Sequence, residues 1–89
     1  MIEKQLTIIN KLGLHARAAA KLVTTASQFQ ADIRITREDR EIDGKSIMSV
    51  MMLAANKGTK IQLSAHGEDE LDALNALETL INNRFDEPE

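Results

Sequence analysis

The chain has 89 residues, a net charge of −3 at pH 7 and no cysteine, which excludes disulfides, thiol catalysis and cysteine-ligated zinc. Hydrophobic residues make up 43% of the sequence, enough for one domain, and the lack of Trp and Tyr makes its core aliphatic. No basic cluster is interleaved with aromatic residues, no apolar run is long enough for a membrane span, and no signal-peptide pattern is present. We therefore expect a cytoplasmic protein that neither binds nucleic acid nor inserts into a membrane.

The first half of the chain predicts a strand, a helix and a hairpin. Residues 6–9 alternate well enough for a strand, and residues 16–28 have the spacing of a half-buried helix. Residues 31–36 alternate strictly, which predicts a strand with one solvated face. A polar turn over 37–40, with both of its arginines solvated, connects this strand to a short partner over 41–43. The apolar face of the predicted helix consists of Ala19, Leu22, Val23, Ala26 and Phe29.

The second half predicts a short helix, a strand and a final helix. Ser46 is a favourable N-cap for a helix over 47–55, and residues 56–58 are typical of a helix end. Residues 59–65 alternate again as a strand, and the acidic residues that follow suit the first turn of a helix. Residues 85–89 are expected to be a frayed acidic tail. The apolar stripe of the final helix consists of Leu71, Leu74, Leu77 and Ile81.

The predicted element order is βαββαβα, which makes the chain an α+β protein. Each helix has one apolar stripe and each strand one apolar face, so we expect a two-layer open-faced sandwich with three helices on one face of the sheet. A four-stranded antiparallel sheet in the order 1-4-2-3 satisfies the right-handed crossover rule, and pattern alone leaves other split arrangements open. Residues 1–89 are expected to form a single domain.

The segment around His15 is the main functional candidate. Gly13 supplies a permissive backbone just before the predicted helix begins, which places His15 near the N-cap. The first amides of a helix have no intrahelical partner and carry partial positive charge. An anion bonded to the imidazole would meet the amides of Ala16, Arg17 and Ala18, with the Arg17 guanidinium within reach. We predict that this segment holds a phosphoryl group on His15.

Two motifs resemble one known family. Residues 13–19, GLHARAA, look like the active-site motif of HPr, the histidine-containing phosphocarrier family of the bacterial phosphoenolpyruvate-dependent phosphotransferase system. Residues 44–53, GKSIMSVMML, match its second motif, and the element order agrees over essentially the whole chain. Ala18 stands where many members have proline, which leaves one more amide for the phosphate.

The resemblance implies a carrier that is modified in turn by enzymes, and not an enzyme itself. It implies that His15 accepts phosphate from phosphorylated enzyme I and passes it to a IIA-type component in sugar uptake or its regulation, with Arg17 steadying the phosphoryl group. In the family the Nδ1 nitrogen carries the phosphate. An alternative within the family is a nitrogen-branch regulatory module that signals through its phosphorylation state. A small histidine-dependent hydrolase ranks last, because no Ser, Asp or Glu has a suitable spacing to orient His15.

Two further features of the second motif suggest functions. Ser46 matches a family position that a dedicated HPr kinase phosphorylates in some bacteria, although a plain N-cap serine explains it equally well. Ile47, Met48 and Met51 share one helix face, and methionine suits a surface that docks several partners. Neither a metal site nor a cofactor is expected: His66, the other histidine, has no second ligand at metal spacing.

Overall fold

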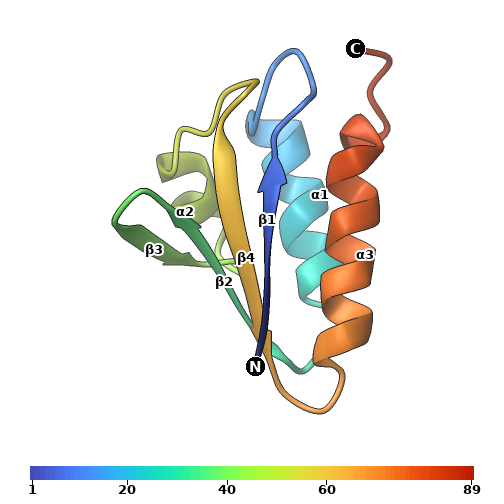
Figure 1. The fold of residues 1–89 in the computed structure, drawn as a ribbon. Helices are drawn as coiled ribbons and strands as arrows, with labels where there is room; N and C mark the ends of the chain where they lie inside the picture. The colour runs from blue at the N-terminus through green and yellow to red at the C-terminus, as the bar shows by residue number, and fades with distance from the viewer.

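The computed structural model describes residues 1–89, in which one antiparallel sheet forms a layer covered on one side by helices (Figure 1). The strand order is β1-β4-β2-β3, which confirms the predicted α+β open-faced sandwich. None of the helices is both long enough and apolar enough to cross a membrane. The elements are β1 (Ile2–Thr7), α1 (Ala16–Ala26), β2 (Asp32–Arg37), β3 (Arg40–Asp43), α2 (Ile47–Met52), β4 (Lys60–His66), α3 (Glu70–Asn82) and a 3-10 turn, η1 (Arg84–Asp86).

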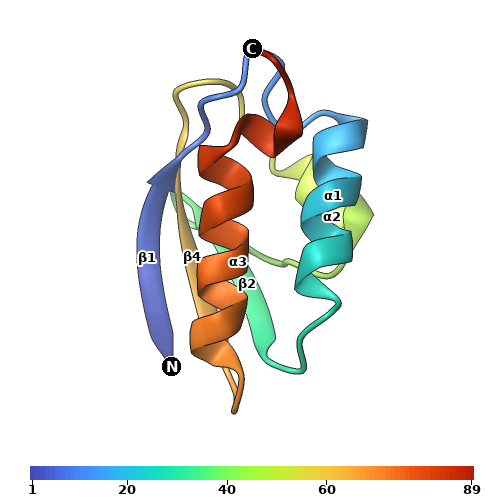
Figure 2. The ribbon, with the colours of Figure 1, turned by 90° about the vertical axis from the view of Figure 1, so that its right-hand side faces the viewer.

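The core lies between the sheet and the helices (Figure 2). Alternate residues of β2 and β4 point into it, as the strict alternation predicted. The intervening residues are exposed or partly buried. A cluster of 21 buried apolar residues joins the two layers into a single core. The inward residues of these strands are Ile33, Ile35, Ile61, Leu63 and Ala65.

The first strand begins four residues earlier than its alternation indicated. The strand β1 pairs with β4 from Ile2, opposite Ala65, to Thr7, opposite Lys60. Charged residues early in the chain belong to the strand because β4 supplies partners for their backbone hydrogen bonds, whichever side chains face outward. Beyond the strand, Ile8 still exchanges hydrogen bonds with the loop between α2 and β4, donating to the Thr59 carbonyl at 2.9 Å.

The helix α2 ends at Met52, so the predicted extension to residue 55 is wrong. Ala54 adopts a left-handed conformation, φ +54°, which stops the helix. The guanidinium of Arg37 donates to the carbonyls of residues 53 and 54, both at 2.9 Å, and that of Arg40 donates to the Met52 carbonyl at 2.7 Å. The turn between β2 and β3 therefore caps the end of α2, and the expectation that its arginines are merely solvated is wrong.

The end of the chain is not a frayed tail. Phe85 is fully buried, and the residues 84–86 all have positive φ, between 54° and 63°, which reverses the chain after α3. The segment 84–89, here called the C-terminal tail, then lies beside the loop between β1 and α1 (Figure 2). Within α3, Leu71 is 61% exposed and does not belong to the predicted apolar stripe, while Ala73 is buried.

Asp69 connects the start of α3 to the segment before β2. Its side chain makes no cap bond within its own helix, and its two oxygens instead accept the amides of Gln30 and Ala31, both at 2.8 Å. The hydrogen bond from Gln30 is the largest of the causes that hold the pKa of Asp69 below its usual value of 3.8. The carboxylate therefore stabilises the fold more strongly than its protonated form does.

We expect Asp69→Ala to lower the free energy of unfolding near neutral pH. Because the pKa is lower in the folded state than in the unfolded state, the stabilisation is present above pH 3.8 and is lost as the pH falls through the native pKa. The gap between wild type and variant in urea unfolding should therefore close in acid. Glu68→Ala, which removes an exposed neighbouring carboxylate, is the matched control and should change little. A gap independent of pH contradicts this account.

Candidate functional site

The loop between β1 and α1 is rigidly fixed beneath the candidate site. Asn10 is fully buried and its side-chain amide donates to the Gly13 carbonyl at 2.8 Å. Gly13 has φ +67°, and a Cβ there would lie 2.6 Å from the Ala55 carbonyl oxygen. No other residue fits this position without strain. Leu14 then donates its amide to the same carbonyl at 2.9 Å, so the loop delivers His15 to the start of α1 in one orientation.

His15 is the N-cap residue of α1, as predicted. Its backbone is extended, φ −73° and ψ 178°, and its carbonyl accepts the Ala19 amide at 2.8 Å. Its imidazole makes no cap bond, so the first amides of the helix have no side-chain partner. The side chain is 28% exposed. The geometry thus leaves a reachable imidazole beside the positive end of a helix.

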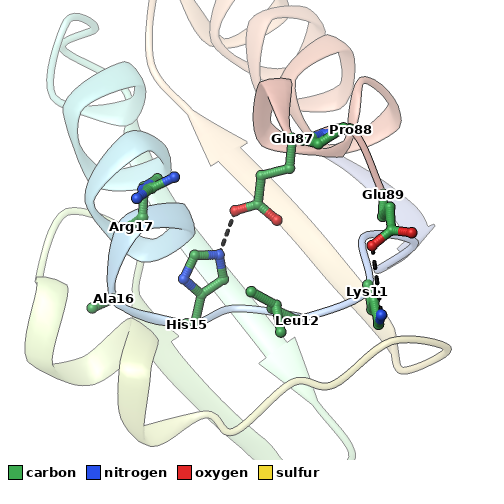
Figure 3. A pocket seen from close by; sticks show the side chains of 8 residues that line it. All are labelled: Lys11, Leu12, His15, Ala16, Arg17, Glu87, Pro88 and Glu89. Atoms are coloured by element: carbon green, nitrogen blue, oxygen red, sulfur yellow. Dashed lines mark hydrogen bonds and ion pairs between the residues drawn. The ribbon is translucent and has the colours of Figure 1, made fainter.

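The predicted phosphate contacts differ in accessibility. Ala16 and Arg17 are exposed, and the Arg17 side chain lies next to His15 (Figure 3). Ala18 is fully buried, so its amide is covered and the structure does not support it as an additional donor. The pocket at this end of α1 has a volume of ≈ 650 Å³ and is lined by Lys11, Leu12, His15, Ala16, Arg17, Glu87, Pro88 and Glu89.

Sequence reasoning missed the part of the site that comes from the C-terminal tail. The Glu87 carboxylate contacts the His15 ring at Nε2 and accepts the Asn10 side-chain amide at 3.0 Å (Figure 3). Burial alone raises the pKa of Glu87, but the hydrogen bonds from Asn10 and His15, with the charge of Arg17 nearby, hold it below its usual value. Glu87 is therefore a carboxylate at neutral pH. Nothing in the local pattern of an acidic tail indicates a partner 72 residues away.

The exposed face of α2 contains the predicted docking residues. Met48 is 66% exposed, and Ile47 and Met51 are each 40% exposed, so none of them belongs to the core. Val50 supplies the buried side of this short helix. Two more exposed apolar residues, Met52 and Leu12, were not predicted. The exposed apolar side chains that α2 carries are typical of an interaction surface.

Ser46 is the N-cap of α2. Its backbone is extended, φ −111° and ψ 112°, and its hydroxyl accepts the Ser49 amide at 3.4 Å. The capping role predicted for Ser46 is confirmed. Its phosphorylation by a kinase stays a prediction.

The sheet order, the helices on one face and the histidine at the start of α1 define a class of small open-faced sandwich with a reachable imidazole at a helix N-terminus. A family model described as "PTS HPr component phosphorylation site" matches residues 2–83. The chain belongs to the HPr family of the phosphotransferase system.

Relatives and solved structures agree with this assignment. The phosphocarrier protein HPr of Pseudomonas aeruginosa is 60% identical over 86 residues, which cover 96% of each chain. The HPr of Pseudomonas putida is 57% identical over 90 residues and the match covers both chains fully. The crystal structure of HPr-C-His from Thermoanaerobacter tengcongensis superposes with a TM-score of 0.97 and 43% identity over both whole chains. The chain is thus a phosphocarrier of the bacterial phosphotransferase system, an intermediate and not a catalyst.

Arg17→Ala should slow phosphoryl transfer without changing the fold. A charge-assisted hydrogen bond is worth about 1.5–3 kcal/mol, which corresponds to about a 10- to 150-fold slower transfer. Because Arg17 is exposed and outside the core, its removal should barely move the thermal midpoint. Arg34→Ala, on the open face of the sheet and paired with Asp32, is the control. Equal transfer rates for Arg17→Ala and wild type would show that the guanidinium does not act on the phosphoryl group.

Proposed function

We propose that the chain accepts a phosphoryl group on His15 from phosphorylated enzyme I and passes it to a IIA-type component, in sugar uptake or its regulation. The observation that carries the proposal is the N-cap position of His15, whose side chain is 28% exposed and unused in capping. Membership of the HPr family supports enzyme I and IIA components as the partners.

The arrangement suits a transferred phosphate in three ways. The amides of Ala16 and Arg17, two exposed residues, lie at the positive end of α1, where anions are favoured. The Arg17 guanidinium adds a charged donor beside the ring. The His15 ring lines this pocket and its side chain is 28% exposed, so a partner protein can reach it.

The test is labelling with radioactive phosphoenolpyruvate and catalytic amounts of purified enzyme I. We expect about one label for each chain, labile in acid and stable in base, as for a phosphohistidine. Adding a purified IIA component should then remove the label from the chain and place it on that protein. A chain that takes no label, or a label stable in acid, contradicts the proposal. Comparing sugar-specific and nitrogen-branch IIA proteins as acceptors distinguishes the two branches.

Met48→Glu should weaken both the accepting and the delivering step. Since one phosphate enters and leaves through His15, the donor and acceptor proteins must contact overlapping surfaces. The exposed apolar residues of α2 form a surface of the type that docks other proteins. A charge there should cost about 1 kcal/mol or more of binding free energy, which raises the apparent KM about fivefold for each partner.

The matched control is Leu71→Glu, which places the same charge at an exposed apolar residue of α3. It should leave both apparent KM values unchanged. Thermal midpoints should stay at the wild-type value for both variants, because both side chains are exposed. If Met48→Glu affects one partner only, the two docking surfaces are separate.

A further inference from the structure

All the internal methionines of the chain lie on one short helix. The sequence has four methionines, and three of them, Met48, Met51 and Met52, belong to the six-residue helix α2. The fourth, Met1, forms an ion pair with Glu70 through its amino group. The central apolar cluster contains no methionine, and the chain has no cysteine. The sulfur chemistry of the protein is thus concentrated on α2 and absent from the core.

The three methionine side chains of α2 are neighbours and are open to solvent. Met51 and Met52 follow Met48 by three and four residues, which are the spacings that bring helix side chains next to one another. Met52 is 65% exposed, as open as Met48, while Met51 is less exposed at 40%. A small oxidant dissolved in water can therefore reach all three sulfur atoms, those of Met48 and Met52 more readily than that of Met51.

The helix α2 does not depend on these three side chains for its place in the fold. Val50 and Leu53 hold it against the core, and they are 0% and 1% exposed. The Ser46 hydroxyl caps its first turn, and the Arg40 guanidinium donates to the main-chain carbonyl of Met52 at 2.7 Å. Neither cap involves a sulfur atom. A chemical change at the sulfur atoms therefore leaves the contacts that hold the helix in place.

We propose that Met48, Met51 and Met52 form a modification site for hydroperoxides, and that their oxidation to sulfoxides weakens the binding of the carrier to its partners. The proposal rests on the docking role proposed for the exposed face of α2. In each step a sulfur lone pair attacks one peroxide oxygen, so that an S–O bond forms and the O–O bond breaks. Sulfur loses two electrons to the peroxide. With hydrogen peroxide, the released hydroxide takes the proton from the transferred oxygen and leaves as water.

Oxidation changes the chemistry of the docking face more than its shape. The thioether of methionine is apolar, flexible and polarizable, whereas the sulfoxide is polar. When a partner covers this face, the sulfoxide oxygen loses its water, and an apolar partner surface offers it no hydrogen bond. The step does not involve His15, which belongs to the start of α1. We therefore expect weaker docking of both enzyme I and the IIA component, with the transfer chemistry retained.

The first part of the test maps the oxidation of the folded protein by hydrogen peroxide. The three methionines of α2 fall in one tryptic peptide, residues 46–57, and Met1 falls in another, residues 1–4. Tandem mass spectrometry should show Met48 and Met52 gaining oxygen faster than Met51, while the thermal midpoint stays at the untreated value. Met1 is 71% exposed and serves as the internal reference. A peptide 46–57 that stays reduced after Met1 is oxidised overturns the inference.

The second part of the test measures transfer kinetics with enzyme I and with a IIA component. The oxidised protein should show an apparent KM raised about fivefold or more for both partners, as expected when contact residues of an interface are impaired. Its kcat should not change. Treatment with the reductases MsrA and MsrB, which reduce the two sulfoxide epimers, should restore the untreated KM. This rescue would show that sulfoxides, and no other damage, cause the change.

The control is a variant that combines Met48→Leu, Met51→Leu and Met52→Leu. Leucine is apolar and close to methionine in volume but has no sulfur atom, so only Met1 remains oxidisable to a sulfoxide in this variant. Each protein is compared with itself before and after peroxide treatment, so a difference between the untreated proteins does not enter. The KM should rise in wild type and stay constant in the variant. If the variant loses its fold, the reductase rescue of wild type decides the question.

An equal rise in the KM of the leucine variant overturns the inference, because the lesion then lies outside α2. A fall in kcat without a change in KM also overturns it. If the untreated protein takes no label from enzyme I, the proposed function fails and the inference fails with it. If the untreated protein is labelled and the fully oxidised protein shows the same KM, only the inference fails.

Discussion

His15→Ala is expected to take no label from enzyme I and phosphoenolpyruvate while retaining the fold. His15 lies at the N-cap, but its ring contributes no cap bond and is 28% exposed, so its loss removes the reactive nitrogen and leaves the core intact. Circular dichroism and the thermal midpoint verify the fold, and labelling under the conditions used for wild type measures the loss. The expected effect is complete, because His15 is the one histidine among the residues that line the pocket.

The second histidine provides the control for this variant. His66 ends β4 and is exposed, and His66→Ala should take label at the wild-type rate. Because the chain has only these two histidines, any phosphohistidine that remains in His15→Ala must be assigned to His66. That result would overturn the assignment of the acceptor.

Phe85→Ala should destabilise the protein by about 3–5 kcal/mol, the usual cost of removing a fully buried aromatic side chain. Phe85 is 0% exposed and belongs to the central apolar cluster. The free energy of unfolding from urea titration measures this loss. Phe29→Ala is the matched control, since Phe29 is only partly buried at the edge of the same cluster and should cost clearly less.

A small loss in the free energy of unfolding for Phe85→Ala, comparable to that of an exposed position, would contradict the burial of Phe85. It would instead support the frayed tail expected from the sequence. A large loss has a second consequence for the site. Because Phe85 holds the segment that carries Glu87, the contact between the Glu87 carboxylate and His15 should be lost in the variant.

The topology was predictable because each element follows a local rule. Alternation identified the inward residues of β2 and β4, and glycine before an apolar stripe placed His15 at a helix start. The predictions that were wrong concern contacts between segments far apart in the sequence. The arginines of the β2–β3 turn cap α2 because the hairpin lies against its end, and no local pattern encodes that approach.

The candidate site was only half predictable for the same reason. His15 and Arg17 belong to one motif, whereas Glu87 reaches the ring through a chain reversal after α3 and a buried amide at Asn10. An acidic residue in a terminal segment of charged and polar residues is normally solvated. The single signal was Phe85, an aromatic residue in a chain with only two, placed after the end of a helix.

The two ends of the chain lie at opposite ends of the molecule, which matters for how the protein is handled (Figure 1). Met1 forms an ion pair with Glu70 at the end of the sheet away from the pocket, while Glu89 lies on the pocket's rim against Lys11. An affinity tag, fluorophore or fusion partner attached through residue 89 would emerge beside the reactive ring and compete with incoming proteins. The same attachment through Met1 keeps the docking end free, so surface immobilisation for binding measurements belongs at the amino end.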